Sequence, residues 1–278
     1  MKIDAGKLRL AGRLAVFIVL IIIALPVHLI SLRCKEDTRT AIVRGLFKVL
    51  CFCLGFKVKT IGQPSNASPC IYVCNHLSYL DIPIVGSTLK ASFVSRGDVA
   101  GWPVFGYFGK LQRTIFISRK PEKAREAAVA IRERIEAGDR MLFFPEGTSG
   151  DGQRLLPIKS SLFDVARPIV RADGTEQQVI VQPISLIVTE MGNLPIGRHN
   201  RPLYSWYGDM EFVPHFMQAL QMSSFTLEVQ YHDPVTMAQF GSRKELAAHC
   251  ERVMAEGLSR GLAGRPAEVS TLIPAQAH

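Results

Sequence analysis

Past residue 60, short apolar runs alternate with helical segments, and this alternation constrains the fold more than any other feature of the chain. Five runs rich in Val, Ile and Phe have the length of buried strands: 71–74, 92–95, 114–117, 141–144 and 179–188. Between two of them, Pro121 opens and Gly138 closes a helix whose alanines and isoleucines form one stripe. The pattern predicts an α/β domain with a mainly parallel sheet flanked by helices on both faces.

The chain before residue 60 has a different character. Residues 14–32 carry no charged side chain, and as a helix they would be about 28 Å long, just short of a ~30 Å hydrocarbon core. No small-residue cleavage site follows, so we expect the segment to be retained. Basic residues on both flanks leave open whether it crosses a membrane or dips in and returns. In the next stretch, 41–56, Arg44 and Lys48 share one helical face and apolar residues the other, as in an interfacial helix.

These features divide the chain into three expected segments. Residues 1–59 would form a membrane-anchoring, membrane-associated helix pair, and residues 60–262 the α/β domain. Ser242 and Glu245 have capping-box spacing and predict a last helix that runs to about Leu258. The tail 263–278 is rich in Ala and Pro and is expected to be disordered.

The net charge of +9 is concentrated at one end of the chain. Residues 1–59 hold eleven Lys/Arg against three Asp/Glu, whereas the remaining residues hold twenty-two against twenty-one. A nucleic-acid-binding protein would carry its basic stripe on the folded domain. Here the basic residues adjoin the most apolar segment, so anionic lipid headgroups are the expected partner and nucleic acid is excluded as the main one.

The six cysteines form no CxxC pair, and their spacing fits neither a zinc site nor a redox motif. We therefore expect no metal site and no disulfide scaffold. Free cysteines of this kind are mostly small buried hydrophobic residues and are typical of a reducing compartment.

Polar residues that packing does not explain follow two of the expected strands, where α/β domains collect their function. The first strand is followed by Asn75-His-Leu-Ser-Tyr-Leu-Asp81, and the fourth by Pro145-Glu-Gly-Thr-Ser149. His76 and Asp81 can meet if His76 lies in the turn and Asp81 in the first turn of a helix, which Pro83 favours. A His bound to a carboxylate is the general-base part of a catalytic triad. Spacing alone equally allows a structural or capping contact.

The motifs that the chain lacks narrow the chemistry further. It contains no GxSxG elbow, P-loop, HExxH or GxGxxG. A general base without a nucleophile from the enzyme favours direct transfer to a hydroxyl group of the substrate.

Four blocks in order resemble the glycerolipid acyltransferases, the family of bacterial lysophosphatidic acid acyltransferase. They are His76-x4-Asp81, the block 115–119, Phe144-Pro-Glu-Gly-Thr148 and the block 181–184. The resemblance implies catalysis by His76 and Asp81. It also implies an acceptor site near Arg119, Glu146, Gly147 and Thr148, with Lys159 as a further basic residue or a plain solvated lysine.

The resemblance further implies a membrane-bound O-acyltransferase without a cofactor. It would move a fatty acyl group from a thioester of acyl carrier protein or coenzyme A to a lysolipid. Its expected location is the bacterial inner membrane, with the active site facing the cytoplasm. A serine hydrolase or thioesterase, and an inactive lipid-binding module, are the more distant alternatives.

One position departs from the lysophosphatidic acid enzymes. There the Phe-Pro-Glu-Gly-Thr block usually continues with an arginine suited to a phosphate dianion, whereas this chain has Ser149 followed by Gly-Asp-Gly. That variant resembles the lyso-ornithine lipid acyltransferases of the same family, so lyso-ornithine lipid is the preferred acceptor. Lysophosphatidic acid is the alternative, because Arg119, Arg154 or Lys159 could hold a phosphate.

Overall fold

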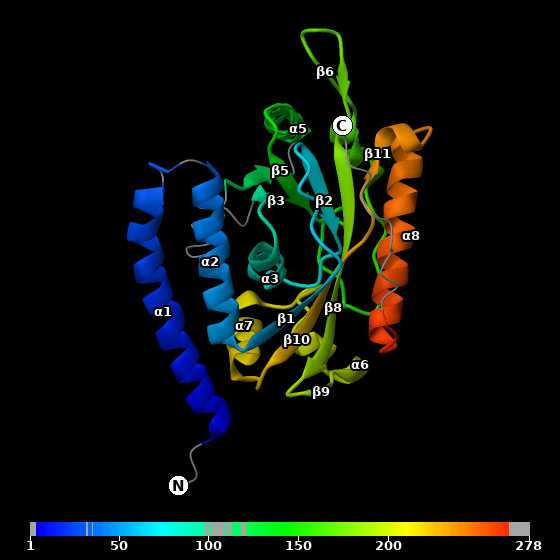
Figure 1. Cartoon of the computed structure of the whole chain (residues 1–278). Coiled ribbons are helices and arrows are strands. Elements are labelled where there is room, and N and C mark those ends of the chain that lie inside the picture. Colours follow the sequence, from blue (N-terminus) through cyan, green and yellow to red (C-terminus); the bar gives the residue numbers. More distant parts are fainter. Residues whose placement is uncertain are drawn as a thin grey trace.

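The computed structural model describes residues 4–31, 33–34, 36–97, 101, 109, 113–117 and 121–266. The expected α/β architecture is confirmed: a mainly parallel sheet lies between two layers of helices (Figure 1). The strands of the sheet run in the order β1-β10-β8-β2-β5-β3-β4, and β9 and β11 also pair with β8. Their bounds are Phe56–Ile61 for β1, Cys70–Cys74 for β2, Ser92–Arg96 for β3, Ile115–Ile117 for β4, Arg140–Phe143 for β5, Ile180–Met191 for β8, Leu194–Pro195 for β9, Phe225–Tyr231 for β10 and Val235–Thr236 for β11.

The five strands that the sequence predicts are β2, β3, β4, β5 and β8. Neighbouring pairs among them are all parallel, because helices or long connections join them. Within this sheet the antiparallel pairs all involve β8, with β9, β10 and β11 as partners. The short strands β6 and β7 form a separate antiparallel pair. The strands β1 and β10, which pair in parallel, were not predicted. The sheet therefore begins at Phe56, ahead of the expected boundary at residue 60.

Two apolar clusters cover the two faces of the sheet. One face packs against α2 (Glu36–Leu54), α3 (Asp81–Thr88) and α7 (Phe212–Gln221), with α1 (Ala5–Ser31) outside them. The other packs against α5 (Pro121–Glu136), the 3-10 helix η2 (Ser160–Ala166) and α8 (Arg243–Leu262). Figure 1 shows α1 and α2 on one side of the sheet and α8 on the other. The short elements are β6 (Ile169–Val170), β7 (Glu176–Gln177), α6 (Gly197–Asn200), η3 (Arg201–Leu203) and η4 (Met237–Gln239).

The last helix begins as its capping box predicts, because the Ser242 side chain accepts a hydrogen bond from the Glu245 amide. It continues past Leu258 to Leu262. Residues 267–278, which hold most of the expected disordered tail, lie outside the described residues.

The two N-terminal helices form an antiparallel pair (Figure 1). The inner helix α2 is anchored by buried Val43, Phe47 and Leu50. The outer helix α1 turns Leu14 and Phe17 toward the body, while Ile18 and Ile22 are more than half exposed on its far side. Among the described residues, no helix has the length and apolar character needed to cross a membrane.

Two basic residues of α1 contact the body of the protein. The Arg13 guanidinium donates hydrogen bonds to the carbonyls of Leu220, Met222 and Ser223, and Arg9 donates to the carbonyl of Gln221. These carbonyls lie at the end of α7, where the last turn of a helix leaves acceptors unpaired. Part of the N-terminal positive charge therefore caps a helix.

Candidate active site

The connection from β2 to α3 brings His76 and Asp81 into direct contact. Asp81 is the first residue of α3, and His76 lies in the loop before it, as the sequence predicts. The two atoms His76 Nδ1 and Asp81 Oδ2 are 2.8 Å apart. Asp81 is fully buried, whereas the His76 side chain keeps 21% of its surface exposed. Because Nδ1 faces the carboxylate, Nε2 is the ring nitrogen left for a substrate.

The Asp81 carboxylate is surrounded by hydrogen-bond donors. Its Oδ2 also accepts from the backbone amides of Leu77, at 2.6 Å, and Ser78, at 3.0 Å. Its Oδ1 accepts from the hydroxyl of Tyr204, at 2.8 Å. A carboxylate without access to water needs such donors to remain charged. The site is therefore built to hold an anion beneath His76.

Glu146, in the loop after β5, binds the backbone on both sides of the site. Its Oε1 accepts from the His76 amide at 2.7 Å, and its Oε2 accepts from the Leu156 amide at 2.8 Å. Burial raises the pKa of Glu146 to about 7, against the lowering effect of these two hydrogen bonds. Both carboxylate oxygens are thus engaged within the protein, and they fix His76 to the loop that follows β5.

Neighbouring side chains pack closely around Gly147 and His76. Gly147 has φ of +72°, and a Cβ at this position would clash with the Lys159 side chain. Glycine allows both this conformation and the close approach of the lysine. The Phe144 ring stacks on His76, with 4.1 Å between the ring centroids. Lys159 itself is exposed and lies over Gly147. Thr148, the residue after Gly147, is also exposed.

Ser149 is tied to a distant part of the chain. Its hydroxyl donates a hydrogen bond to the carbonyl of Trp206, and the Trp206 amide in turn donates to the carbonyl of Leu77 at 2.9 Å. The next residue, Gly150, donates from its amide to the His76 carbonyl at 2.8 Å. The loop after β5 is thereby attached to the His76 loop directly and through Trp206.

Of the residues that the sequence singles out, the structure brings together seven: His76, Asp81, Glu146, Gly147, Thr148, Ser149 and Lys159. Arg119 lies outside the described residues, and Arg154 is exposed. In the part of the chain that the structure describes, no three His, Cys, Asp or Glu side chains form a metal-binding group, and all six cysteines are free.

Sequence reasoning missed the segment 204–206, which supplies Tyr204 and Trp206 to the site. No motif marks this segment, and it is separated from Asp81 by more than a hundred residues. The available signal was compositional: a Tyr-Ser-Trp-Tyr run is rich in aromatic residues with polar groups that need partners when buried.

Comparison with known proteins identifies the family. A family model described as "Acyltransferase" matches residues 56–187. A lyso-ornithine lipid O-acyltransferase of Brucella abortus is 33% identical over 94% of this chain and 97% of its own length. The chain belongs to the acyltransferase family.

Other members differ in how much of the chain they match. A lyso-ornithine lipid O-acyltransferase of Rhizobium meliloti is 32% identical over 98% of this chain and 92% of its own. A 1-acyl-sn-glycerol-3-phosphate acyltransferase of Neisseria gonorrhoeae is 31% identical, but only over 48% of this chain and 52% of its own. The crystal structure of a 1-acyl-sn-glycerophosphate acyltransferase from Thermotoga maritima has the same fold, with a TM-score of 0.68 at 19% identity, covering 95% of this chain and 98% of that one.

Proposed function

We propose that this acyltransferase moves a fatty acyl group from a thioester to the hydroxyl of lyso-ornithine lipid and so forms ornithine lipid. The observation that carries the proposal is the contact between His76 and Asp81: a buried, fully hydrogen-bonded carboxylate holds a partly exposed imidazole. Among the described residues, none bonds to His76 Nε2 and no nucleophilic side chain is hydrogen-bonded to the ring, which suits a substrate hydroxyl as the attacking group.

The reaction then follows from the geometry of the pair. His76 Nε2 takes the proton of the acceptor hydroxyl as its oxygen attacks the thioester carbonyl. Asp81 accepts a hydrogen bond from Nδ1–H and stabilises the imidazolium that forms. The tetrahedral intermediate collapses, the carbon–sulfur bond breaks, and the leaving thiolate receives the proton from Nε2. The products are an ester and a free thiol, and His76 returns to its starting state.

The acceptor assignment is supported by the loop after β5 and by the relatives. The relatives that match most of the chain are named lyso-ornithine lipid O-acyltransferases. The position where an arginine would suit a phosphate dianion holds Ser149, and its hydroxyl is already used on the Trp206 carbonyl. The loop therefore presents no bidentate phosphate ligand at this position.

A competition assay tests the acceptor. Purified protein in detergent micelles receives one acyl thioester with equal amounts of lyso-ornithine lipid and lysophosphatidic acid, and both products are quantified by mass spectrometry. We expect ornithine lipid to form faster, and faster formation of phosphatidic acid would reverse the assignment. The variants Ser149→Arg and Ser149→Ala then separate an added charge from the lost bond to Trp206: Ser149→Arg alone should shift the preference toward lysophosphatidic acid.

Lysophosphatidic acid is the second candidate because of Lys159. The lysine side chain lies over Gly147, next in sequence to Glu146, where an ammonium group could pair with a phosphate. The experiment above includes this outcome.

A serine hydrolase has less support. A serine and a histidine do meet elsewhere, Ser185 Oγ and His232 Nε2 at 2.8 Å. However, Ser185 is fully buried beneath α8 and donates to the Met254 carbonyl. Burial also lowers the pKa of His232 to about 4. Ser185 has no exposed surface at which a substrate could meet its hydroxyl.

Membrane association through α1 and a thioester donor complete the proposal. The outward face of α1 exposes Ile18, Val19, Ile22 and Ile23, between 47 and 64% of each side chain, which suits the apolar interior of a bilayer. We place the protein at the bacterial inner membrane with its site on the cytoplasmic side, where acyl carrier protein and coenzyme A thioesters are found. Offering each donor in the assay identifies the one that is used.

A further inference from the structure

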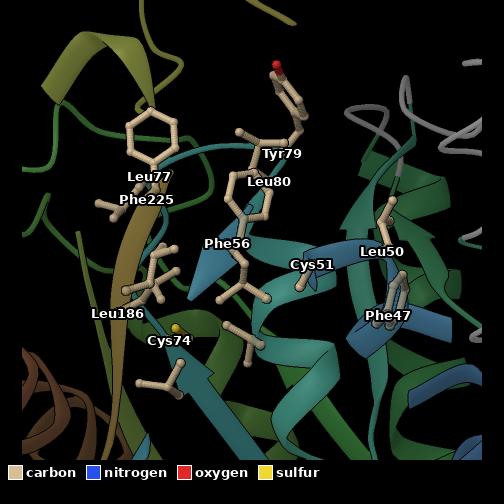
Figure 2. Packing of buried hydrophobic residues seen from close by; sticks show 14 of the residues in the cluster. Phe47, Leu50, Cys51, Phe56, Cys74, Leu77, Tyr79, Leu80, Leu186 and Phe225 are labelled. Atoms are coloured by element: carbon tan, nitrogen blue, oxygen red, sulfur yellow. The ribbon is translucent and has the colours of Figure 1, made fainter. Parts of the chain in front are cut away.

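Tyr204 touches the catalytic pair from a part of the chain that carries no acyltransferase motif. It follows η3, and its hydroxyl lies 2.8 Å from Asp81 Oδ1. The residue is fully buried, and its ring packs edge-on against Phe225 and Phe56, with centroids 5.5 and 6.3 Å away. Figure 2 shows these two phenylalanines packed beside the His76 loop residues Leu77 and Leu80.

The two carboxylate oxygens of Asp81 differ in the number of hydrogen-bond donors that they have. Oδ2 has three donors, His76 and the amides of Leu77 and Ser78, whereas among the described residues Oδ1 has Tyr204 alone. Asp81 has no exposed surface, so bulk water does not replace a missing donor. The orientation of the Asp81 carboxylate therefore depends on the Tyr204 hydroxyl.

We infer that Tyr204 is a positioning residue of the transferase, acting on His76 through Asp81; this inference rests on the proposed function. Its hydrogen bond turns the carboxylate so that Oδ2 meets Nδ1, and it disperses the negative charge that His76 experiences. Without it, one buried oxygen is unpaired, the carboxylate pulls harder on the Nδ1 proton, and its orientation is less fixed.

The residues next to Tyr204 in sequence connect the two loops of the site. Two residues further on, Trp206 donates from its amide to the Leu77 carbonyl and accepts from the Ser149 hydroxyl. Between them, Ser205 lies against Gly152, where a Cβ would come within 2.9 Å of the serine hydroxyl. The segment 204–206 thus contacts both the loop with His76 and the loop with Ser149.

The chain offers a matched control. Tyr231 is also a buried tyrosine, and its hydroxyl bonds to Thr88 Oγ1 at 2.6 Å, away from the catalytic pair. Tyr231→Phe therefore removes one hydroxyl and one internal hydrogen bond, as Tyr204→Phe does, without changing the donors of Asp81. Effects shared by both variants are structural, and effects found only in Tyr204→Phe act through Asp81.

The test measures kcat, KM and the pH profile of acyl transfer for the full-length wild-type protein and both variants. Loss of a hydrogen bond to a charged group should lower kcat of Tyr204→Phe roughly 10- to 100-fold with little change in KM. The acid limb of its kcat/KM profile should move to higher pH, since His76 would keep its proton longer. The other ionisable groups that interact with Asp81, Glu146 and Cys74, are the same in all three proteins. Tyr231→Phe should keep the wild-type profile.

A second replacement covers the case in which Tyr204→Phe does not fold. Site-specific 3-fluorotyrosine at position 204 keeps the ring and the hydroxyl but makes the phenol a stronger donor, so the acid limb should move to lower pH. A wild-type profile in a folded Tyr204→Phe or in the fluorotyrosine protein would overturn the inference and leave the proposed function intact. Absence of transfer by the wild-type protein itself would instead overturn the proposed function.

Discussion

The His76 loop and helix α1 are both rich in apolar residues, yet they differ in which side chains are buried and which are exposed to solvent. In and beside the loop, the polar side chains of Asn75 and Asp81 are buried, and both have partners: the Asn75 amide bonds to both backbone groups of Leu186, and Asp81 receives four donors. On α1, apolar side chains such as Ile22 are exposed. Buried polar groups need partners inside the chain, whereas exposed apolar groups indicate a partner outside it. The first region thus fits the catalytic role that we propose for it, and the second fits the proposed association with a membrane.

The largest effect is expected when the proposed base of the first region, His76, is removed. His76→Ala should lower acyl transfer by at least ~10²–10⁴-fold, because general-base catalysis contributes about that much. Asp81→Asn should fall nearly as far, because an amide holds the imidazole in the wrong tautomer. Rates are measured with thermal unfolding of each variant as the control for folding. If His76→Ala kept a tenth of the wild-type rate, the role given to this residue would be wrong.

Variants on opposite faces of α1 test the second region. Ile18→Ser with Ile22→Ser should weaken binding to vesicles that contain anionic lipid by about 3 kcal/mol or more, given ~1.5–3 kcal/mol for each buried side chain. Thermal stability in detergent should barely change, because both residues point away from the body. Phe17→Ala should do the reverse, since Phe17 packs against Phe216 of α7 with ring centroids 5.5 Å apart. Equal vesicle binding by the double variant and the wild type would contradict a membrane role for this face.

The smallest of the three expected effects is a pH dependence of the stability of the first region, and it comes from Glu146. Burial raises its pKa from 4.5 to about 7 in the folded protein. The folded state therefore binds more protons than the unfolded state in this interval. The stability that the raised pKa provides is complete below pH 4.5 and lost as pH rises through about 7. It amounts to roughly 3 kcal/mol, at about 1.4 kcal/mol for each pKa unit.

The measurement compares the free energy of unfolding of the wild type and Glu146→Gln between pH 5 and 8. The free energy of unfolding of the wild type should fall relative to that of Glu146→Gln as pH rises, because glutamine does not titrate. A difference that is constant with pH would show that Glu146 titrates near its ordinary value.

The sequence predicts the parts of this molecule that local patterns encode. Five strands of the sheet, the helix opened by Pro121 and the start of α8 at Ser242 follow from apolar runs and capping residues. The contact between His76 and Asp81 is also local, since five residues and a turn suffice to form it.

What the sequence does not predict depends on contacts between distant segments. The strands β1 and β10 pair with each other although they are far apart in the sequence. Tyr204 likewise contacts Asp81 only because of the tertiary fold. Arg13 shows the same limit: its charge indicates a lipid partner, but its guanidinium caps the carbonyls at the end of α7. Charge and periodicity describe a side chain, whereas its partner is set by packing.

The hydrogen bonds of the His76 backbone limit where the protein could be redesigned to accept other lysolipids. Its amide is held by Glu146 and its carbonyl by Gly150, so the arc from 146 to 150 is pinned to the base at both ends. Only the three residues between these anchors, 147–149, are available for variation, and Gly147 among them is restricted by its positive φ. A library aimed at new headgroups should therefore vary positions 148 and 149 at constant loop length, because an insertion would displace His76 as well as the loop.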